Sequence, residues 1–581
     1  MKRFYFLLLF ALLLIVFTVG RLIFCWYNSD IETLDLTQFS WTCLRGLPLD
    51  IRTAAALLLV PALLSLQKRF SLRTLLAPYY IFVGFLIALI VGADTIMYEF
   101  WKFKLGAVVI SYAMSPEGAT SSVEPIFLIT RAGSVLAAWA IISTLFIAIT
   151  PKSTDSNWKQ CLAILVLALL PIGINTAHVR KSSLFANHTA TNSIYAFASS
   201  FLDERTYHIM PTAEATAAFD SLYTHNTGAD IQDTLLTNKR PNLLFIQLES
   251  FSGKFVKELG GIDNVAPKMS QLIPQGLFFT NYYSNSFRTD RGTVALQSGM
   301  VSHPTLSLMR EFSLHGKLAS LPNALRQVGY ETAYVYGGPM TNMHKREYLQ
   351  DMLIDTLYDY TAFTPEQLTS AWGAHDEAAA YRTVQLIKER KQSERPWAFT
   401  FQTISSHEPW VVPYKRLSDP KLNAFAYTDD VLGQMIATLK NDPELWDNLL
   451  VIILPDHGYL YGQTYEEPAF FHSPMLWLGG ALKHTGTVDK LMNQSDIAAT
   501  LLAQMGISAE AFPWSRNIFS RAYKHPFVYC NFPAGLMMKD ATGTTLFDLT
   551  AREVITEQGT PSAERLHAAR ALLQHSYEVM R

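Results

Sequence analysis

The first third of the chain consists of long apolar runs separated by short polar loops. Each run approaches the roughly 20 residues that a helix needs to cross a lipid bilayer. The pattern therefore predicts five transmembrane helices. Their expected ranges are Tyr5–Phe24, Leu49–Leu66, Leu76–Met97, Ile126–Ile149 and Cys161–Ile174.

Basic residues in the short loops predict how these helices are oriented. The segments before the first span, between the second and third, and between the fourth and fifth are basic, so we expect them in the cytoplasm. No small-residue cleavage site follows the first run, which we interpret as an uncleaved span. Five crossings then place everything after about Thr176 outside. The basic residues are Lys2, Arg3, Lys68, Arg69, Arg73, Lys152 and Lys159.

Two charged residues, Asp94 and Arg131, fall near the outer ends of the third and fourth predicted spans. An unpaired charge at membrane depth is expensive. We therefore expect the two side chains to pair with each other. The alternative is that Arg131 meets the phosphate of a lipid headgroup.

From Pro241 onward the pattern changes to short apolar runs that alternate with mixed helical segments. This alternation is typical of an α/β domain with a central, mostly parallel sheet covered on both faces. The sequence thus predicts an α-helical membrane domain followed by an extracytoplasmic α/β domain. The expected strands are Asn242–Leu248, Glu331–Tyr336, Trp397–Thr403 and Leu449–Leu454.

The same patterns divide the chain into four expected regions. Residues 1–176 form the membrane domain and residues 177–239 a juxtamembrane connector. The α/β domain occupies residues 240–540, and residues 541–581 form a tail that is helical from Pro561 to Met580. We assign no chemistry to the tail.

Composition excludes several classes of protein. The chain has 47 basic and 49 acidic residues, so no strongly basic surface predicts nucleic acid as a partner. Its four cysteines are too few and too scattered for a disulfide framework or a thiolate zinc cluster. They therefore do not indicate the compartment, which has to be inferred from the membrane topology.

Polar residues at two strand ends are candidates for metal binding. Asp456 and His457 directly follow the apolar run at residues 449–454, and Gly458 permits an unusual backbone conformation after them. Glu249 occupies the matching place after another strand. Such sheets place their sites at the carboxyl ends of parallel strands. Taken singly, the Asp-His pair is also consistent with an ordinary turn, and Glu249 with a neighbour of a helix N-cap.

A hydroxyl residue between two arginines is the candidate nucleophile. Thr289 lies between Arg288 and Arg291, directly before a mixed apolar stretch that we expect to be helical. A lone threonine there would be only an N-cap. The free N–H groups and positive dipole of a helix N-terminus, together with two arginines, instead favour a nucleophile beside a phosphate-binding cradle.

Five motifs in order resemble the lipoteichoic acid synthase-like phosphotransferases of the alkaline phosphatase/sulfatase superfamily. The resemblance covers the five-span part and nearly the whole extracytoplasmic domain. The motifs are Glu249 after NLLFIQL, Thr289 in FRTDRG, Arg346 in YGGPMTNMHKREY, His407 in SSHEPW and Asp456-His457 in PDHG.

This resemblance implies roles for individual residues. Glu249, Thr289, Asp456 and His457 match residues that hold one divalent ion, with manganese expected and zinc or magnesium as alternatives. Thr289 also matches the nucleophile that carries the transferred group. Arg346 and His407 match residues that grip the phosphate and the headgroup, and Asp496 in QSDIAATLLAQMG looks like a late structural motif.

The chain departs from that family in the expected headgroup pocket. Arg288-Thr289-Asp290-Arg291-Gly292 stands where the synthases have Lys-Thr-Ser-Asp, and His344 stands where a tryptophan is typical. We expect Arg288, Arg291 and His344 to contact the substrate. His472 in FFHSP is either a further ligand or proton donor, or a structural histidine.

The resemblance implies transfer of phosphoglycerol from phosphatidylglycerol to a lipid-linked or glycan acceptor, through a covalent intermediate on Thr289, at the outer face of the bacterial cytoplasmic membrane. The alternative is transfer of phosphoethanolamine from phosphatidylethanolamine. Enzymes of that kind that act on lipid A usually have several disulfides, and Cys530 is the one cysteine in this part of the chain. A sulfatase lacks support because no Cys/Ser-x-Pro-x-Arg motif occurs. A phosphodiesterase and a catalytically silent membrane sensor are the remaining alternatives.

Overall fold

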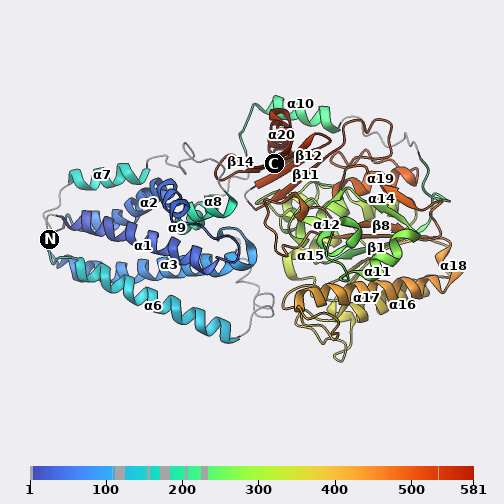
Figure 1. Ribbon diagram of the computed structural model, residues 1–581, viewed down its shortest axis with the longest axis horizontal. Helices are drawn as coiled ribbons and strands as arrows, with labels where there is room; N and C mark the ends of the chain where they lie inside the picture. The colour runs from blue at the N-terminus through green and yellow to red at the C-terminus, as the bar shows by residue number, and fades with distance from the viewer. Residues whose placement is uncertain are drawn as a thin grey trace. The chain divides into compact units, whose positions relative to one another are not determined.

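The computed structural model divides into two compact units, which are described separately (Figure 1). The helical unit comprises Met1–Asp203 and Asp548–Ile555, and the α/β unit comprises Glu204–Phe547 and Thr556–Arg581. Lys2, Arg3, Lys68, Thr176 and residues 170–174 of the fifth predicted span lie outside the described residues. The structure describes residues 4–67, 69–107, 109–110, 125–153, 158–169, 183–202, 207–223, 233–533 and 535–581.

The helical unit confirms the prediction of an apolar, helical N-terminal part. Among the described residues, four helices are long and apolar enough to cross a membrane. A fifth apolar helix, α7, is described over 12 residues only. The helices are α1 (Tyr5–Tyr27), α2 (Leu36–Leu64), α3 (Leu72–Trp101), α6 (Pro125–Ile149), α7 (Trp158–Leu169), α8 (Leu184–Ala190) and α9 (Ser193–Ser199).

The expected pairing of Asp94 with Arg131 is wrong. The fully buried Asp94 carboxylate is paired with Lys104, and it also accepts a hydrogen bond of 2.6 Å from the Ser193 hydroxyl. The chain reverses after α3, where Lys102 adopts a left-handed φ of 55°, and this turn returns Lys104 to Asp94. The guanidinium of Arg131 instead lies 4.9 Å from the centre of the Tyr27 ring.

The α/β unit contains an eight-stranded, mostly parallel sheet in the order β5-β4-β6-β1-β7-β8-β2-β9. β8 pairs antiparallel with both β7 and β2, whereas the other ladders are parallel. The four predicted strands form its centre. The bounds are β1 (Asn242–Leu248), β2 (Leu277–Phe279), β4 (Glu331–Tyr336), β5 (Thr356–Tyr358), β6 (Trp397–Gln402), β7 (Leu449–Pro455), β8 (Met475–Leu478) and β9 (Gly486–Val488).

Helices cover both faces of this sheet, because successive side chains of a strand point to opposite faces (Figure 1). In β1, Leu244 and Ile246 belong to the core packed against α16 and α17, whereas Leu243 and Phe245 belong to the core packed against α14 and α19. The helices of the unit are α10 (Thr212–Tyr223), α11 (Pro267–Leu272), α12 (Thr289–Ser298), α13 (Phe312–His315), α14 (Leu321–Gln327), α15 (Lys345–Asp351), α16 (Asp376–Glu389), α17 (Pro420–Lys440), α18 (Pro443–Trp446), α19 (Ile497–Gln504) and α20 (Ala563–Val579).

A second sheet, of four strands in the order β11-β12-β13-β14, was not predicted. Its strands β12 and β13 lie on either side of residue 540, the expected end of the α/β domain. The predicted helix of the tail is present as α20. The remaining strands are β3 (Tyr282–Tyr283), β10 (Met492–Asn493), β11 (Phe527–Phe532), β12 (Gly535–Asp540), β13 (Gly543–Asp548) and β14 (Glu553–Gly559).

A buried ion pair connects the start of α19 to β11. The Arg516 guanidinium donates to both carboxylate oxygens of Asp496, at 3.0 and 2.7 Å, and to the carbonyl oxygen of Phe527, at 2.8 Å. Asp496 is fully buried and Arg516 is 2% exposed. The location and contacts of Asp496 agree with the structural role that the resemblance implies for it.

Replacing Arg516 with methionine should lower the stability of the α/β unit by about 3–5 kcal/mol, because Asp496 would keep a buried charge without its partner. Thermal unfolding of the detergent-solubilised chain measures this loss. The matched control is Lys257→Met, which removes one side of an exposed pair with Asp263 at 3.3 Å and should cost less than about 1 kcal/mol. Equal effects of the two variants would contradict the prediction.

Candidate active site

The strand order brings two predicted ligands together at the carboxyl edge of the sheet. β1 and β7 are parallel neighbours, and their register pairs Leu248 with Pro455. Glu249 and Asp456 are the next residues of the two strands, so the backbone places them side by side. Asp456 N donates a hydrogen bond of 3.0 Å to Leu248 O, which extends the ladder to the site.

A glycine allows α12 to approach this edge. A Cβ atom added to Gly292 would lie 2.0 Å from the carbonyl oxygen of Asp456. Any side chain there would therefore push the first turn of α12 away from β7. Thr289 is the first residue of this helix, so Gly292 allows its hydroxyl to reach the strand ends.

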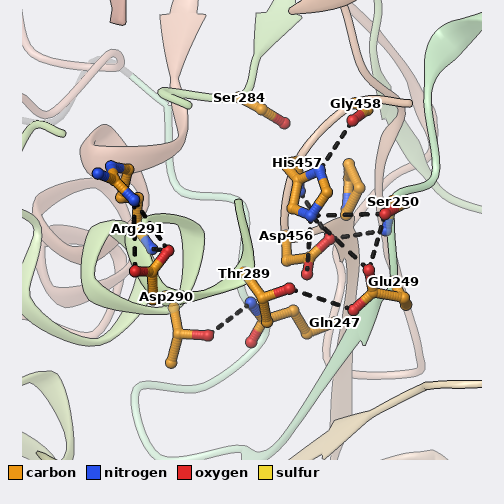
Figure 2. A network of polar contacts seen from close by, with 12 residues as sticks. Gln247, Glu249, Ser250, Ser284, Thr289, Asp290, Arg291, Asp456, His457 and Gly458 are labelled. Atoms are coloured by element: carbon orange, nitrogen blue, oxygen red, sulfur yellow. Dashed lines mark hydrogen bonds and ion pairs between the residues drawn. The ribbon is translucent and has the colours of Figure 1, made fainter. Parts of the chain in front are cut away.

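The four predicted metal ligands come together in one buried cluster (Figure 2). Glu249, Asp456 and His457 each offer a ligand atom within 4.8 Å of the others. The Thr289 hydroxyl donates a hydrogen bond of 3.3 Å to Glu249 Oε2. All four residues are buried: Glu249 is 1% exposed, Asp456 0%, His457 8% and Thr289 8%.

Local hydrogen bonds orient the three ligand atoms. Asp456 Oδ1 accepts from the backbone N–H groups of Ser250 and His457, both at 2.7 Å, whereas the buried Oδ2 has no hydrogen-bond partner among the described residues. His457 Nδ1 lies 2.8 Å from Gly458 O and donates to it, which leaves Nε2 as an acceptor. That Nε2 lies 3.7 Å from Glu249 Oε1 and from Asp456 Oδ2. An unpaired carboxylate oxygen, a second carboxylate and a neutral imidazole facing one another suit a divalent cation.

The shifted pKa values of Asp456 and His457 also indicate that the cluster suits a divalent cation. Burial and the nearby Glu249 carboxylate raise the pKa of Asp456 well above its usual value. Burial also lowers the pKa of His457, which favours the neutral ring that binds metals. A cation between these groups would relieve the repulsion between the two carboxylates.

The two arginines beside Thr289 are placed differently. Arg288 precedes α12, and its charge acts on Asp290 and His457. Arg291 is turned toward Asp290, at 3.2 Å (Figure 2). Its Nε also donates a hydrogen bond of 2.9 Å to the carbonyl oxygen of His303. Asp290 also accepts a hydrogen bond of 2.5 Å from the Ser307 hydroxyl. The structure thus assigns Arg291 contacts that hold α12 against the following loop.

Of the other predicted substrate residues, His344 ends a short 3-10 turn, Arg346 lies in the first turn of α15, and His407 lies on the loop after β6. Arg346 is paired with Asp359. The His407 ring packs edge-on against Trp372 with centroids 4.6 Å apart, and its charge lowers the pKa of Glu249 against the opposing effect of burial. His344 is exposed, with a left-handed φ of 57° and its ring 4.8 Å from that of Phe312.

His472 is not brought into the cluster. Its Nε2 lies 2.7 Å from Thr280 O, and its ring stacks on Tyr283 with centroids 5.1 Å apart. These contacts agree with the structural alternative. Sequence reasoning missed Ser250, whose hydroxyl donates a hydrogen bond of 2.7 Å to Glu249 Oε1. Its position directly after a buried strand could have indicated that it belongs to the site. Sequence reasoning also missed Lys345, for which the sequence offers no such indication.

Comparison with known proteins agrees with this geometry. Residues 241–507 match the sulfatase family model. The chain is 23% identical over 248 residues to lipoteichoic acid synthase-like YvgJ of Bacillus subtilis, and the match covers 39% of this chain and 38% of that relative. The chain therefore aligns with well under half of that relative's length.

Two solved structures share the fold. An alkaline phosphatase superfamily protein from Vibrio parahaemolyticus superposes with a TM-score of 0.58 at 20% identity, covering 65% of this chain and 98% of that one. The lipoteichoic acid synthase LtaP from Listeria monocytogenes superposes with a TM-score of 0.52 at 17% identity, covering 64% and 98%.

The family model identifies residues 241–507 as a sulfatase domain, and the two superposed structures share its fold. The predicted resemblance to lipoteichoic acid synthase-like proteins is confirmed. Among the described residues, four N-terminal helices are long and apolar enough to cross a membrane, and a sulfatase-like domain follows them in the chain.

Proposed function

We propose that this protein transfers a phosphoglycerol group from phosphatidylglycerol to a lipid-linked or glycan acceptor through a covalent intermediate on Thr289. The observation that carries the proposal is the Thr289 hydroxyl at the start of α12, hydrogen-bonded to Glu249 inside a cluster whose Asp456 Oδ2 is unpaired. This arrangement combines a nucleophile, a proton acceptor and a cation site in one place.

In the proposed reaction, the Thr289 oxygen attacks the phosphorus of the donor lipid. An O–P bond forms, the bond from phosphorus to the diacylglycerol oxygen breaks, and diacylglycerol leaves as an alcohol after taking up a proton. The Thr289 proton moves toward Glu249, its hydrogen-bond acceptor. In the second step an acceptor hydroxyl attacks the same phosphorus: an O–P bond to the acceptor forms, the bond from phosphorus to the Thr289 oxygen breaks, and the acceptor's proton is passed to the Thr289 oxygen, which restores the hydroxyl.

The proposed cation site consists of Glu249, Thr289, Asp456 and His457, with Mn²⁺ as the expected ion. A divalent ion bound there would lower the pKa of the Thr289 hydroxyl and withdraw charge from a phosphate oxygen. The positive end of the α12 dipole would help to hold the phosphate. Arg288, Arg346 and His407 are the proposed contacts to phosphate and headgroup.

A location in the bacterial cytoplasmic membrane, with the N-terminus inside and the sulfatase domain outside, completes the proposal. It is supported by the basic loops between the apolar helices. A membrane anchor suits this chemistry because the donor lipid never leaves the bilayer.

Incubating the purified full chain with Mn²⁺ and headgroup-labelled phosphatidylglycerol tests the function. Without an acceptor, peptide mass spectrometry should find a glycerol phosphate adduct on Thr289. An adduct formed only from phosphatidylethanolamine would support the alternative donor instead. Release of labelled headgroup to water without any adduct would indicate a phosphodiesterase and contradict the proposal.

A further inference from the structure

A buried lysine lies close to the cluster but takes no part in the proposed chemistry. Lys345 is the first residue of α15 and is 3% exposed. Met343 and His344 before it both adopt left-handed φ angles, of 60° and 57°. Two consecutive non-glycine residues in this region are energetically unfavourable, so the backbone that directs Lys345 inward is held by its surroundings.

The partners of Lys345 are neutral. Its Nζ donates 2.7 Å to the Gln402 side-chain oxygen and lies 3.8 Å from the centre of the Tyr336 ring. Gln402 ends β6, the neighbour of β1 on the side away from β7, and Tyr336 ends β4, the next strand beyond β6. Tyr334 donates 2.6 Å to the same Gln402 oxygen, which fixes that acceptor.

Lys345 differs in this respect from the other buried cations. Arg21, Arg45, Arg516 and Arg565 are also buried among the described residues. Each of these arginines lies within 3.2 Å of a carboxylate oxygen. A buried charge without such a partner is costly, and an amide oxygen and an aromatic ring compensate for only part of that cost.

The remaining compensation comes from the cluster. Burial lowers the pKa of Lys345 to about 8, and the carboxylates of Glu249, Asp456 and Asp290 act in the opposite direction. Asp290 is already paired with Arg291 and Arg310, so the negative charge left to balance Lys345 is that of the Glu249–Asp456 pair. A divalent ion bound by Glu249 and Asp456 would neutralise the negative charge that compensates Lys345, and Lys345 would repel that ion. A phosphate anion bound beside the ion would supply negative charge again.

We propose that Lys345 is a positioning residue whose buried charge weakens cation binding to the cluster and strengthens binding of the phosphate group that follows. This inference rests on the proposed function only in taking a phosphate ester as the substrate. In the absence of phosphate, the cation binds less tightly than it would without the lysine. Phosphate binds most tightly when the cation and the charged lysine are both present.

The test measures two affinities in the full chain with Lys345→Met, which keeps the length of the side chain and removes the charge. Calorimetry should show about tenfold tighter Mn²⁺ binding and, in the Mn²⁺-loaded protein, about tenfold weaker binding of inorganic phosphate, as expected for one nearby charge. Lys345→Gln, which keeps a polar group near Gln402, should shift both affinities in the same directions. The Lys345→Gln variant replaces Lys345→Met in the test if the methionine variant does not fold.

The opposite signs separate this role from a structural one. A lysine that merely supports the fold would weaken both ligands when replaced, and a lysine without influence would change neither; either result would overturn the inference. Lys317→Met is the matched control, because Lys317 is exposed. Neither affinity depends on which headgroup is transferred, so a wild type that binds Mn²⁺ and phosphate but fails the labelled-lipid assay would refute the proposed function alone.

Discussion

Replacing Thr289 by alanine should abolish the covalent intermediate and lower the transfer rate by about 10⁴-fold or more, the scale seen when a catalytic nucleophile is removed. The hydroxyl donates a hydrogen bond of 3.3 Å to Glu249 at the start of α12, whereas the Thr293 hydroxyl of the same helix accepts a hydrogen bond from Gln247. Headgroup-labelled lipid turnover and mass spectrometry of the Thr289 peptide measure the loss.

The fold should survive this change. The α12 N-cap is Arg288, and Gly292 rather than Thr289 sets the approach of α12 to β7, so the melting temperature should stay close to that of the wild type. Thr289→Ser retains a nucleophilic hydroxyl and should retain measurable transfer. Thr438→Ala, at an exposed threonine on α17, is the unchanged control. Full activity of Thr289→Ala would exclude Thr289 as the nucleophile.

The central sheet and the cluster could be predicted because both depend on local patterns. Continuous apolar runs identify β1 and β7, and the polar residue that directly follows each run lies at the carboxyl end of its strand. Parallel pairing then forces Glu249 and Asp456 to one edge, whichever loops connect the strands. The role of Gly292 was not predicted, because its close approach to the Asp456 carbonyl oxygen joins two segments that are far apart in the sequence.

Features that depend on distant contacts could not be predicted in this way. Lys345 lies between two residues, His344 and Arg346, that are more exposed than it is, and nothing in that triplet indicates which side chain is buried. Its burial follows from the backbone of the preceding turn. Likewise, Asp94 pairs with Lys104 rather than Arg131 because of a reversal after α3, whereas helix ranges alone favoured the more distant partner.

The second sheet illustrates a different difficulty. Its strands at residues 527–559 include polar positions and short turns, and β14 is mostly exposed or half-buried. Such strands lack the continuous apolar signature of a two-sided parallel sheet. The strands of this sheet were therefore not predicted.

Asp456→Asn should lower the affinity for Mn²⁺ by about 100-fold or more, because it removes the charge of a metal ligand. Replacing a residue that only hydrogen-bonds to a ligand already lowers metal affinity by about 10–100-fold. The amide can still accept from the Ser250 and His457 N–H groups through its oxygen, so the local backbone should be preserved. Calorimetric titration of the metal-free full chain measures the affinity.

The metal-free variant should be at least as stable as the metal-free wild type. Burial and repulsion by Glu249 raise the pKa of Asp456, so in the wild type the cluster retains a proton at a pH where an exposed carboxyl would have lost it. Below that raised pKa, metal binding must release the proton, and the affinity of the wild type should therefore rise with pH. The variant has no such proton at this position and should show a weaker dependence. Adding Mn²⁺ should raise the melting temperature of the wild type and of Asp263→Asn, an exposed control, but not that of Asp456→Asn; equal stabilisation of all three proteins would place the cation elsewhere.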